Sequence, residues 1–265
     1  MVAAFKRFAA HMLGLTFVVF LGGFAGCASL PGSSDGPQEK TTREKAEYHY
    51  KLATGFVYEK RPIAALKEAQ VVLSLDPTHS KAEFLIGFIF MGRRNYAEAE
   101  VHFHRSLKLN PKLYEARNAL AGTYIALKRW QDALDTLEPL LTDPLNPTPW
   151  LAQNNAGWAY HKQGRTREAT YHLKMAVMLK PEFCLGYYNL GQVMKSSRRY
   201  EAARRHFEQS RRHCPKHAPT LLQLGDVYLA TSNKVKAKDA FRDCEKIAGE
   251  SLVGDRCANR RRALP

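Results

Sequence analysis

One repeating period constrains this chain more than any other feature. From residue 46 onward, the same order of small, apolar and proline residues returns every 34 residues. The six repeats span 46–79, 80–113, 114–147, 150–183, 184–217 and 218–251. The twentieth position is alanine in all six repeats, and the eighth is always glycine or alanine. Such a period indicates a chain built from stacked copies of one small structural unit.

The other columns of the period predict how each unit packs. Apolar side chains recur at the seventh, eleventh and twenty-fourth positions, and proline occupies the thirty-second position in four of the six repeats. Two antiparallel helices pack closely where small residues lie at their crossing, and proline ends the second helix of each pair. We therefore predict an all-α chain of six helix-turn-helix repeats.

The period and its small-residue columns resemble the tetratricopeptide repeat, whose characteristic length is 34 residues. The resemblance covers residues 46–251 and implies a right-handed superhelical solenoid in which the first helix of each repeat lines a concave face. Because the end of a solenoid needs a cap with a polar outer face, we expect residues 252–265 to form a short C-terminal cap and a basic tail.

The period is interrupted once, between the third and fourth repeats. Thr148 and Pro149 are additional residues, and the segment 143–149 contains three prolines. Proline restricts its own backbone and that of the preceding residue. We expect a stiff, non-helical connector that bends the solenoid between two groups of three repeats.

Residues 1–26 have the pattern of an export signal. Lys6 and Arg7 precede an apolar run that is too short to span a bilayer, and small residues then precede Cys27. This pattern resembles the lipobox of bacterial lipoproteins. The resemblance implies lipidation of Cys27 and, because Ala28 follows, a place on the outer membrane facing the periplasm. A plain signal peptide with an incidental cysteine is the alternative.

Residues 27–45 connect this predicted anchor to the repeats. Most of the segment is polar and rich in glycine, proline and serine, so we expect a flexible tether.

Positive charge is concentrated toward the C-terminus. The chain has a formal charge of +15, and residues 184–265 hold 17 lysines and arginines against 8 acidic residues. Export would separate the chain from nucleic acid, so we expect these cations to be solvated or to face an acidic protein or anionic lipid.

The sequence contains no pattern typical of catalysis. It lacks a phosphate-binding loop, a dinucleotide-binding motif, a nucleophile elbow and a zinc-protease motif, so we predict no enzyme and no cofactor. The best metal candidate, residues 213–217, lacks a second cysteine pair at zinc spacing, and we predict no metal site. His102, His172 and His206 share the twenty-third position, where we expect a solvent-exposed column.

Cysteine use predicts disulfides. Apart from Cys27, the four cysteines all lie in the last two repeats and the tail, and an even number in an oxidising compartment favours pairing. Cys184 begins the first helix of the fifth repeat and Cys214 ends the second, so antiparallel packing would bring them together. We prefer Cys184–Cys214 with Cys244–Cys257, and buried free thiols are the alternative.

The resemblance also implies a binding surface, because positions five and nine of each first helix face the concave side in tetratricopeptide proteins. Aromatic and amide side chains predominate at these positions, as candidates for a protein-binding groove. They are Tyr50, Phe84, Phe88, Asn118, Asn154, Trp158, Tyr188 and Gln192. Rings supply apolar area and amides can bond a peptide backbone. We expect Tyr50, Phe84 and Phe88 to form a hydrophobic groove; the alternative is that these rings pack within the solenoid.

A lipoprotein with six such repeats resembles the type IV pilus biogenesis lipoproteins, the pilotins that help the pilus secretin to assemble. The segment from Asp143 to Pro149, followed by Asn155-Ala156-Gly157, is similar to a connector of that family. The resemblance implies a non-enzymatic protein, monomeric before it binds, that captures outer-membrane secretin subunits. The alternatives are a lipoprotein of a tight-adherence pilus or secretion system, and a scaffold for peptidoglycan or outer-membrane biogenesis.

Overall fold

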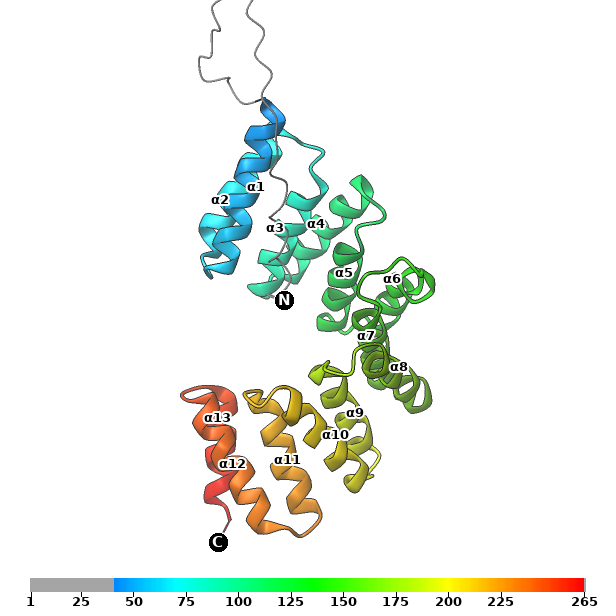
Figure 1. Ribbon diagram of the computed structural model, residues 1–265, viewed down its shortest axis with the longest axis vertical. Coiled ribbons are helices and arrows are strands. Elements are labelled where there is room, and N and C mark those ends of the chain that lie inside the picture. The colour runs from blue at the N-terminus through cyan, green and yellow to red at the C-terminus, as the bar shows by residue number, and fades with distance from the viewer. Residues whose placement is uncertain (1–40, 265) are drawn as a thin grey trace, which may run out of the picture. The chain divides into compact units, whose positions relative to one another are not determined.

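The computed structural model describes residues 41–264, and these form helices without any strand (Figure 1). The helices are α1 (Thr42–Tyr58), α2 (Pro62–Leu75), α3 (Ser80–Gly92), α4 (Tyr96–Leu109), α5 (Tyr114–Ala126), α6 (Trp130–Thr142), α7 (Pro149–Lys162), α8 (Thr166–Leu179), α9 (Cys184–Ser196), α10 (Tyr200–His213), α11 (Ala218–Ala230), α12 (Lys234–Ala248) and α13 (Leu252–Arg262). The predicted signal peptide and Cys27 lie outside the described residues.

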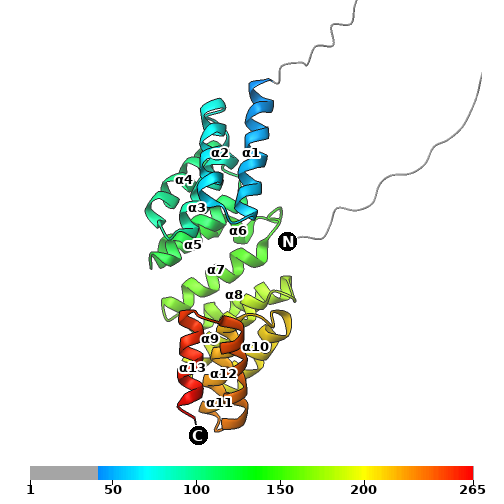
Figure 2. The ribbon, with the colours of Figure 1, turned by 90° about the vertical axis from the view of Figure 1, so that its left-hand side faces the viewer.

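Each repeat forms a helix pair, and each pair packs on the next. The two helices of a repeat contact each other, and the second helix contacts the first helix of the following repeat. The first helices also contact one another from α1 through α9, and α11 to α13 lie side by side at the C-terminal end (Figure 2). The predicted all-α superhelical stack of six helix-turn-helix repeats with a C-terminal cap is confirmed.

The close approach within each repeat depends on positions eight and twenty-four. A Cβ atom added to Gly225 would lie 2.3 Å from the ring of Phe241, and one added to Gly191 would lie 2.5 Å from Phe207. The side chain at position twenty-four is fully buried in every repeat. The pairs are Ala53 with Ala69, Gly87 with Phe103, Ala121 with Leu137, Gly157 with Leu173, Gly191 with Phe207, and Gly225 with Phe241. The large rings therefore occur only opposite glycine.

The turn between the two helices has the same backbone conformation in every repeat. The residue at position fifteen has a positive φ, and the six residues are Lys60, Arg94, Lys128, Gly164, Arg198 and Ser232. The following N–H bonds back to the carbonyl at position eleven, as in Arg61 to Phe56 at 2.8 Å. This is the Schellman arrangement, which satisfies carbonyls at a helix end. Glycine, the residue best suited to it, occurs in one repeat alone.

The first helix begins before the first repeat. α1 starts at Thr42, so residues 42–45 of the predicted tether are helical instead. The Thr41 hydroxyl accepts from the N–H of Glu44 at 3.2 Å, and the Glu44 carboxylate accepts from the N–H of Thr41 at 2.7 Å. This capping box satisfies two backbone donors at the start of the helix.

The connector after the third repeat is non-helical and is held by its own side chains. Asn146 is buried, donates to the Leu140 carbonyl at 2.9 Å and accepts from the N–H of Thr148 at 3.0 Å. The Tyr114 hydroxyl donates to Asp143 at 2.7 Å. The buried core continues across the connector from α6 to α7. The core is therefore not divided there into two groups of three repeats.

The match in size between positions eight and twenty-four can be tested at the last repeat. Gly225→Ala should lower the free energy of unfolding by about 1–3 kcal/mol, because its methyl group meets the ring of Phe241. Phe241→Leu removes that contact, so the double variant should lose less than the sum of the single losses in urea unfolding. Additive losses would contradict the direct contact.

Gly164 tests the turn conformation. Gly164 has φ +79°, so Gly164→Ala should destabilise the chain by about 1 kcal/mol through backbone strain alone, since nothing lies within 4 Å of the added Cβ. Gly55→Ala is the matched control: its Cβ also meets nothing within 4 Å, but it lies inside α1, where alanine should stabilise by about 0.5–1 kcal/mol. Thermal unfolding of both variants would contradict this account if the two shifts had the same sign.

Candidate functional site

The predicted groove residues follow one another along the first helices of the repeats. Because α1, α3, α5, α7 and α9 contact each other in turn, these side chains form one row. The structure divides the row into an aromatic group on α1 and α3 and a more polar group on α5, α7 and α9.

The aromatic group is only partly open. The rings of Phe84 and Phe88 lie 6.1 Å apart, and Phe88 is 41% exposed. Phe84 is half-buried, with its ring 6.0 Å from that of Phe103. Tyr50 packs against His79 with a ring separation of 5.0 Å, and burial, followed by nearby acidic groups, raises the pKa of Tyr50. Phe88 is therefore the ring that a partner can reach most readily.

A mainly apolar hollow of about 360 Å³ lies beside Phe88, and we call it the α1–α3 hollow. Its lining residues are Val57, Lys60, Pro62, Phe88, Ile89, Gly92 and Arg93. It lies between the end of α1, the start of α2 and the end of α3. An apolar side chain can enter it, while the cations of Lys60 and Arg93 suit a carboxylate at its rim.

The amides of the row join neighbouring repeats. Asn155 donates to Asn118 at 3.0 Å, and Asn189 donates to Asn154 at 2.8 Å. In both bonds, the side chain at position five of one repeat accepts a hydrogen bond from the side chain at position six of the next repeat. The two acceptors, Asn118 and Asn154, are each 8% exposed. In this structure, the amide oxygens of Asn118 and Asn154, which we expected to meet a peptide, are bonded within the stack. The sequence signal for these bonds was the amide at position six in the fourth and fifth repeats.

The remaining groove candidates lie on α7 and α9 and are half-buried. Lys162 places its Nζ 4.4 Å from the ring centre of Trp158. Gln192 donates to the Tyr188 hydroxyl at 3.3 Å, and the Tyr188 ring lies 5.9 Å from Phe207. Burial raises the pKa of Tyr188. This part of the row offers aromatic edges and polar groups.

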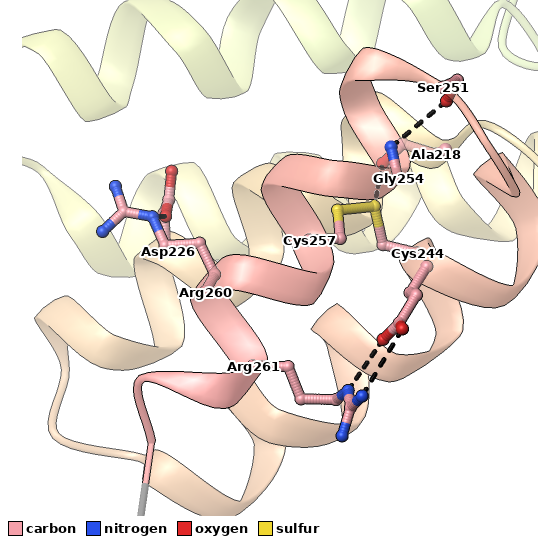
Figure 3. The surroundings of a disulfide bond; sticks show 9 residues. Ala218, Asp226, Cys244, Ser251, Gly254, Cys257, Arg260 and Arg261 are labelled. Atoms are coloured by element: carbon pink, nitrogen blue, oxygen red, sulfur yellow. Dashed lines mark hydrogen bonds and ion pairs between the residues drawn. A yellow bond between two sulfur atoms is a disulfide. The ribbon is translucent and has the colours of Figure 1, made fainter.

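Both predicted cysteine pairs are joined. Cys184 and Cys214, with Cα atoms 5.9 Å apart, link the start of α9 to the residue that follows α10. Cys244 and Cys257 link α12 to α13 (Figure 3). Cys214 therefore has no thiolate with which to bind a metal. No group of three or more metal-binding side chains occurs among residues 41–264.

The cap is a helix docked on the last repeat. α13 contacts both α11 and α12, and Cys257 is fully buried. Arg261 donates to Glu245 at 2.7 Å, and Arg260 lies 3.4 Å from Asp226 (Figure 3). Helix α13 thus covers the end of the stack and is held there by a disulfide, ion pairs and apolar contacts.

The histidine column is not exposed, and that expectation was wrong. His102 lies 2.6 Å from the Glu83 carboxylate, and His172 lies 2.7 Å from the Gln153 amide oxygen. Burial lowers the pKa of His172 and of His206. Position twenty-three faces position four on the first helix of the same repeat in these two cases, so His102 and His172 form contacts between the two helices.

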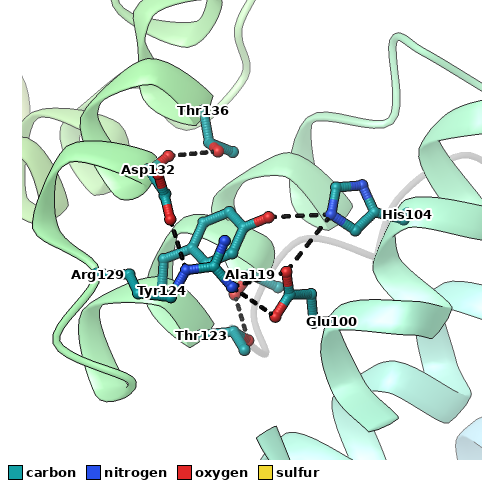
Figure 4. Close-up of polar contacts among 8 residues, drawn as sticks. All are labelled: Glu100, His104, Ala119, Thr123, Tyr124, Arg129, Asp132 and Thr136. Atoms are coloured by element: carbon teal, nitrogen blue, oxygen red, sulfur yellow. Dashed lines mark hydrogen bonds and ion pairs between the residues drawn. The ribbon is translucent and has the colours of Figure 1, made fainter. Parts of the chain in front are cut away.

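A charged cluster joins the second and third repeats (Figure 4). Arg129 donates to both carboxylate oxygens of Glu100 at 2.9 and 3.0 Å and lies 4.3 Å from the centre of the Tyr124 ring. His104 lies 2.9 Å from the Tyr124 hydroxyl. Burial, followed by the Glu100 carboxylate, raises the pKa of Tyr124 to about 12. These groups stabilise an interface between repeats, and the tyrosine remains protonated at neutral pH.

Residues 90–153 match the tetratricopeptide repeat family. With the helix pairs and the 34-residue period in place, this match shows the type of repeat in that segment. Residues 90–153 carry tetratricopeptide repeats, and the other helix pairs have the same fold. Such stacks present extended binding surfaces and generally act as scaffolds for other proteins. Among curated proteins, no sequence matches the chain.

Solved tetratricopeptide structures share this fold. The chain is similar to the type IV pilus biogenesis factor PilW, with a TM-score of 0.71 and 20% identity over 79% of this chain and 96% of PilW. It is similar to PilF of Pseudomonas aeruginosa, with a TM-score of 0.68 and 16% identity over 83% of this chain and 99% of PilF. It also matches the Cut9–Hcn1 hetero-tetramer of the APC/C, with a TM-score of 0.72 and 16% identity over 83% of this chain and 43% of that one. These similarities establish the fold.

No helix in the described part of this tetratricopeptide chain is both long and apolar enough to cross a membrane.

The Cys244–Cys257 disulfide between α12 and α13 should stabilise the docking of the cap helix on the last repeat. Replacing both Cys244 and Cys257 with alanine should cost about 2–4 kcal/mol of stability, because the disulfide closes a short loop. Hydrogen exchange should become faster in α13 and remain slow in α9. The matched variant lacking Cys184 and Cys214 should show the reverse, and equal exchange in α13 for the two variants would contradict a local staple.

Proposed function

We propose that this chain is a non-enzymatic, lipid-anchored scaffold of the outer membrane that binds secretin subunits and promotes their assembly into the type IV pilus pore. Cys27 carries the lipid, and the repeats face the periplasm. The protein is monomeric until it binds its partner. The first helices bind the secretin subunit, and the lipid holds it at the membrane where the ring forms.

The observation that most supports this proposal is the extent of the match to two pilus biogenesis proteins. The chain aligns with 96% of PilW and 99% of PilF, at TM-scores of 0.71 and 0.68. The Pro-rich connector, from Asp143 to Pro149, supports it further by its similarity to the connector of pilotins. That segment is ordered by Asn146 and Asp143, so it is a built feature of the stack.

Within the row of first helices, the α1–α3 hollow is the best candidate contact for a secretin segment. It combines an exposed ring, an apolar wall and two cations. An aliphatic side chain next to a carboxylate would match both features, because apolar burial supplies affinity and the charge orients the segment. The polar part of the row, beyond α5, would then extend the contact.

Deletion of the gene should leave the secretin as monomers in an assay for heat-stable multimers, and pili should be lost.

Phe88→Asp should reduce co-purification of secretin by about tenfold, because it places a charge in the apolar hollow. Val235→Asp is the control: Val235 is 74% exposed on α12, far along the chain from the hollow, and its substitution should change little. Both variants should unfold at a temperature close to that of the unmodified chain.

Normal secretin multimers and normal pili in the deletion strain would refute the proposal. Recovery of peptidoglycan enzymes or outer-membrane assembly proteins in place of secretin would favour the alternative class of envelope scaffold. Genes for a tight-adherence pilus or another secretion system beside this one would favour the remaining alternative.

A further inference from the structure

Helix α10 carries more positive charge than its acidic residues balance. Arg204 donates to Glu201 at 3.0 Å and to Glu208 at 2.8 Å, so one arginine satisfies both acids of the helix. The other arginines of α10 make no ion pair with any residue between 41 and 264. They are Arg205, Arg211 and Arg212.

Two hollows adjoin these arginines, and both have Arg211 and Arg212 in their walls. The first has a volume of about 640 Å³ and also includes Tyr187, Arg205 and His206. The second has a volume of about 560 Å³ and lies between α10 and α12. We call the two together the α10–α12 basic surface. The two hollows adjoin each other at Arg211 and Arg212.

The second hollow has both apolar and basic side chains in its wall. Leu221, which is 2% exposed, and Ile247, which is 40% exposed, are its apolar side chains. Lys216 and Lys246 add two cations, against Asp243 as the one acid among the lining residues. An apolar side chain can therefore be buried here while charged groups on either side of it meet cations.

The electrostatic field in the first hollow is positive. Burial lowers the pKa of His206, and the positive charges of Arg205, Lys174 and Arg199 lower it further. His206 is thus neutral at neutral pH, and the charge of the hollow comes from guanidinium groups. Glu208 also lines this hollow, but its carboxylate is bonded to Arg204 and to the Tyr228 hydroxyl at 3.0 Å.

The shape of the surface favours a narrow polypeptide over a flat membrane. Binding to a bilayer surface uses apolar side chains that protrude beyond the cations into the lipid. Here, Leu221 is only 2% exposed and lines a hollow together with four cations, so it does not protrude beyond them. A segment must enter to reach it. Arginine binds carboxylates through two parallel hydrogen bonds, which suits acidic side chains spaced along a peptide.

We propose that the α10–α12 basic surface binds an acidic protein segment with an aliphatic side chain among its carboxylates. The carboxylates pair with Arg205, Arg211 and Arg212, and the aliphatic side chain packs on Leu221 and Ile247 in the second hollow. This contact is separate from the secretin contact proposed for α1 and α3. Failure of either one therefore leaves the other standing.

A labelled peptide tests this proposal directly. The probe is a fluorescent twelve-residue peptide with three copies of Glu-Asp-Leu-Glu, and its binding to the purified full-length Cys27→Ser chain is followed by anisotropy at low salt. Replacement of Arg205, Arg211 and Arg212 with glutamine should weaken binding by at least about tenfold. A peptide with serine in place of leucine should bind several-fold more weakly, since it loses the apolar contact.

The control variant removes the same charge elsewhere. Arg105→Gln, Lys108→Gln and Arg167→Gln together change three exposed cations that line neither hollow, and this variant should bind within about twofold of the unmodified chain. Circular dichroism should show the same helix content for both triple variants.

Three results would overturn the proposal. The first is equal loss of binding in the two triple variants, which would indicate only a general effect of net charge. The second is retention of peptide binding without the three α10 arginines. The third is binding to vesicles of phosphatidylglycerol and phosphatidylcholine that requires those arginines, with no binding of the peptide, which would assign the surface to anionic lipid.

Discussion

The whole stack depends on one contact that recurs in each repeat: a small residue at position eight against the side chain at position twenty-four. The helices come close enough for a Cβ on Gly225 to meet the Phe241 ring at 2.3 Å. Because protein interiors are close-packed, the sizes of the two positions must change together. Phenylalanine lies opposite glycine in the second, fifth and sixth repeats, whereas alanine lies opposite alanine in the first. The spacing of the helices sets where every other side chain in the row can lie.

The two ends of the stack differ at this contact. The C-terminal repeats combine buried rings with two disulfides and a docked cap, and their core extends from Ala169 to Cys257. The first repeat has only Ala53 and Ala69 at the crossing, within a small separate cluster. In a repeat protein, stability is a sum of local terms, so the N-terminal helices are expected to open most easily. The α1–α3 hollow lies among these less stable N-terminal helices, where a change of conformation around an entering segment costs the least free energy.

The periodic columns were sufficient to predict the helix pairs, the cap and both disulfides, because each follows from the position of a residue along its helix. They were insufficient for contacts that depend on rotation about the helix axis. The position of His102 predicted an exposed column, but position twenty-three faces Glu83 across the pair. The hydrogen bond from Asn155 to Asn118 was not predicted for a related reason, because the side chain at position six contacts the preceding repeat. The capping box at Thr41 was readable and marks the true start of α1.

The distribution of unpaired charge argues that the C-terminal repeats do more than support the rest. Like charges close together repel. Three arginines of α10 have no ion-pair partner among residues 41–264, while Arg204 satisfies both acids on the same helix. This repulsion is present where the fold is most strongly reinforced, by the Cys184–Cys214 link across α9 and α10 and by the capped last repeat. The stability that the disulfide and the cap add there offsets the repulsion between the unpaired arginines in the folded chain. A spacer would have no use for such charge, whereas a scaffold with a second contact needs cations that its own acids do not already occupy.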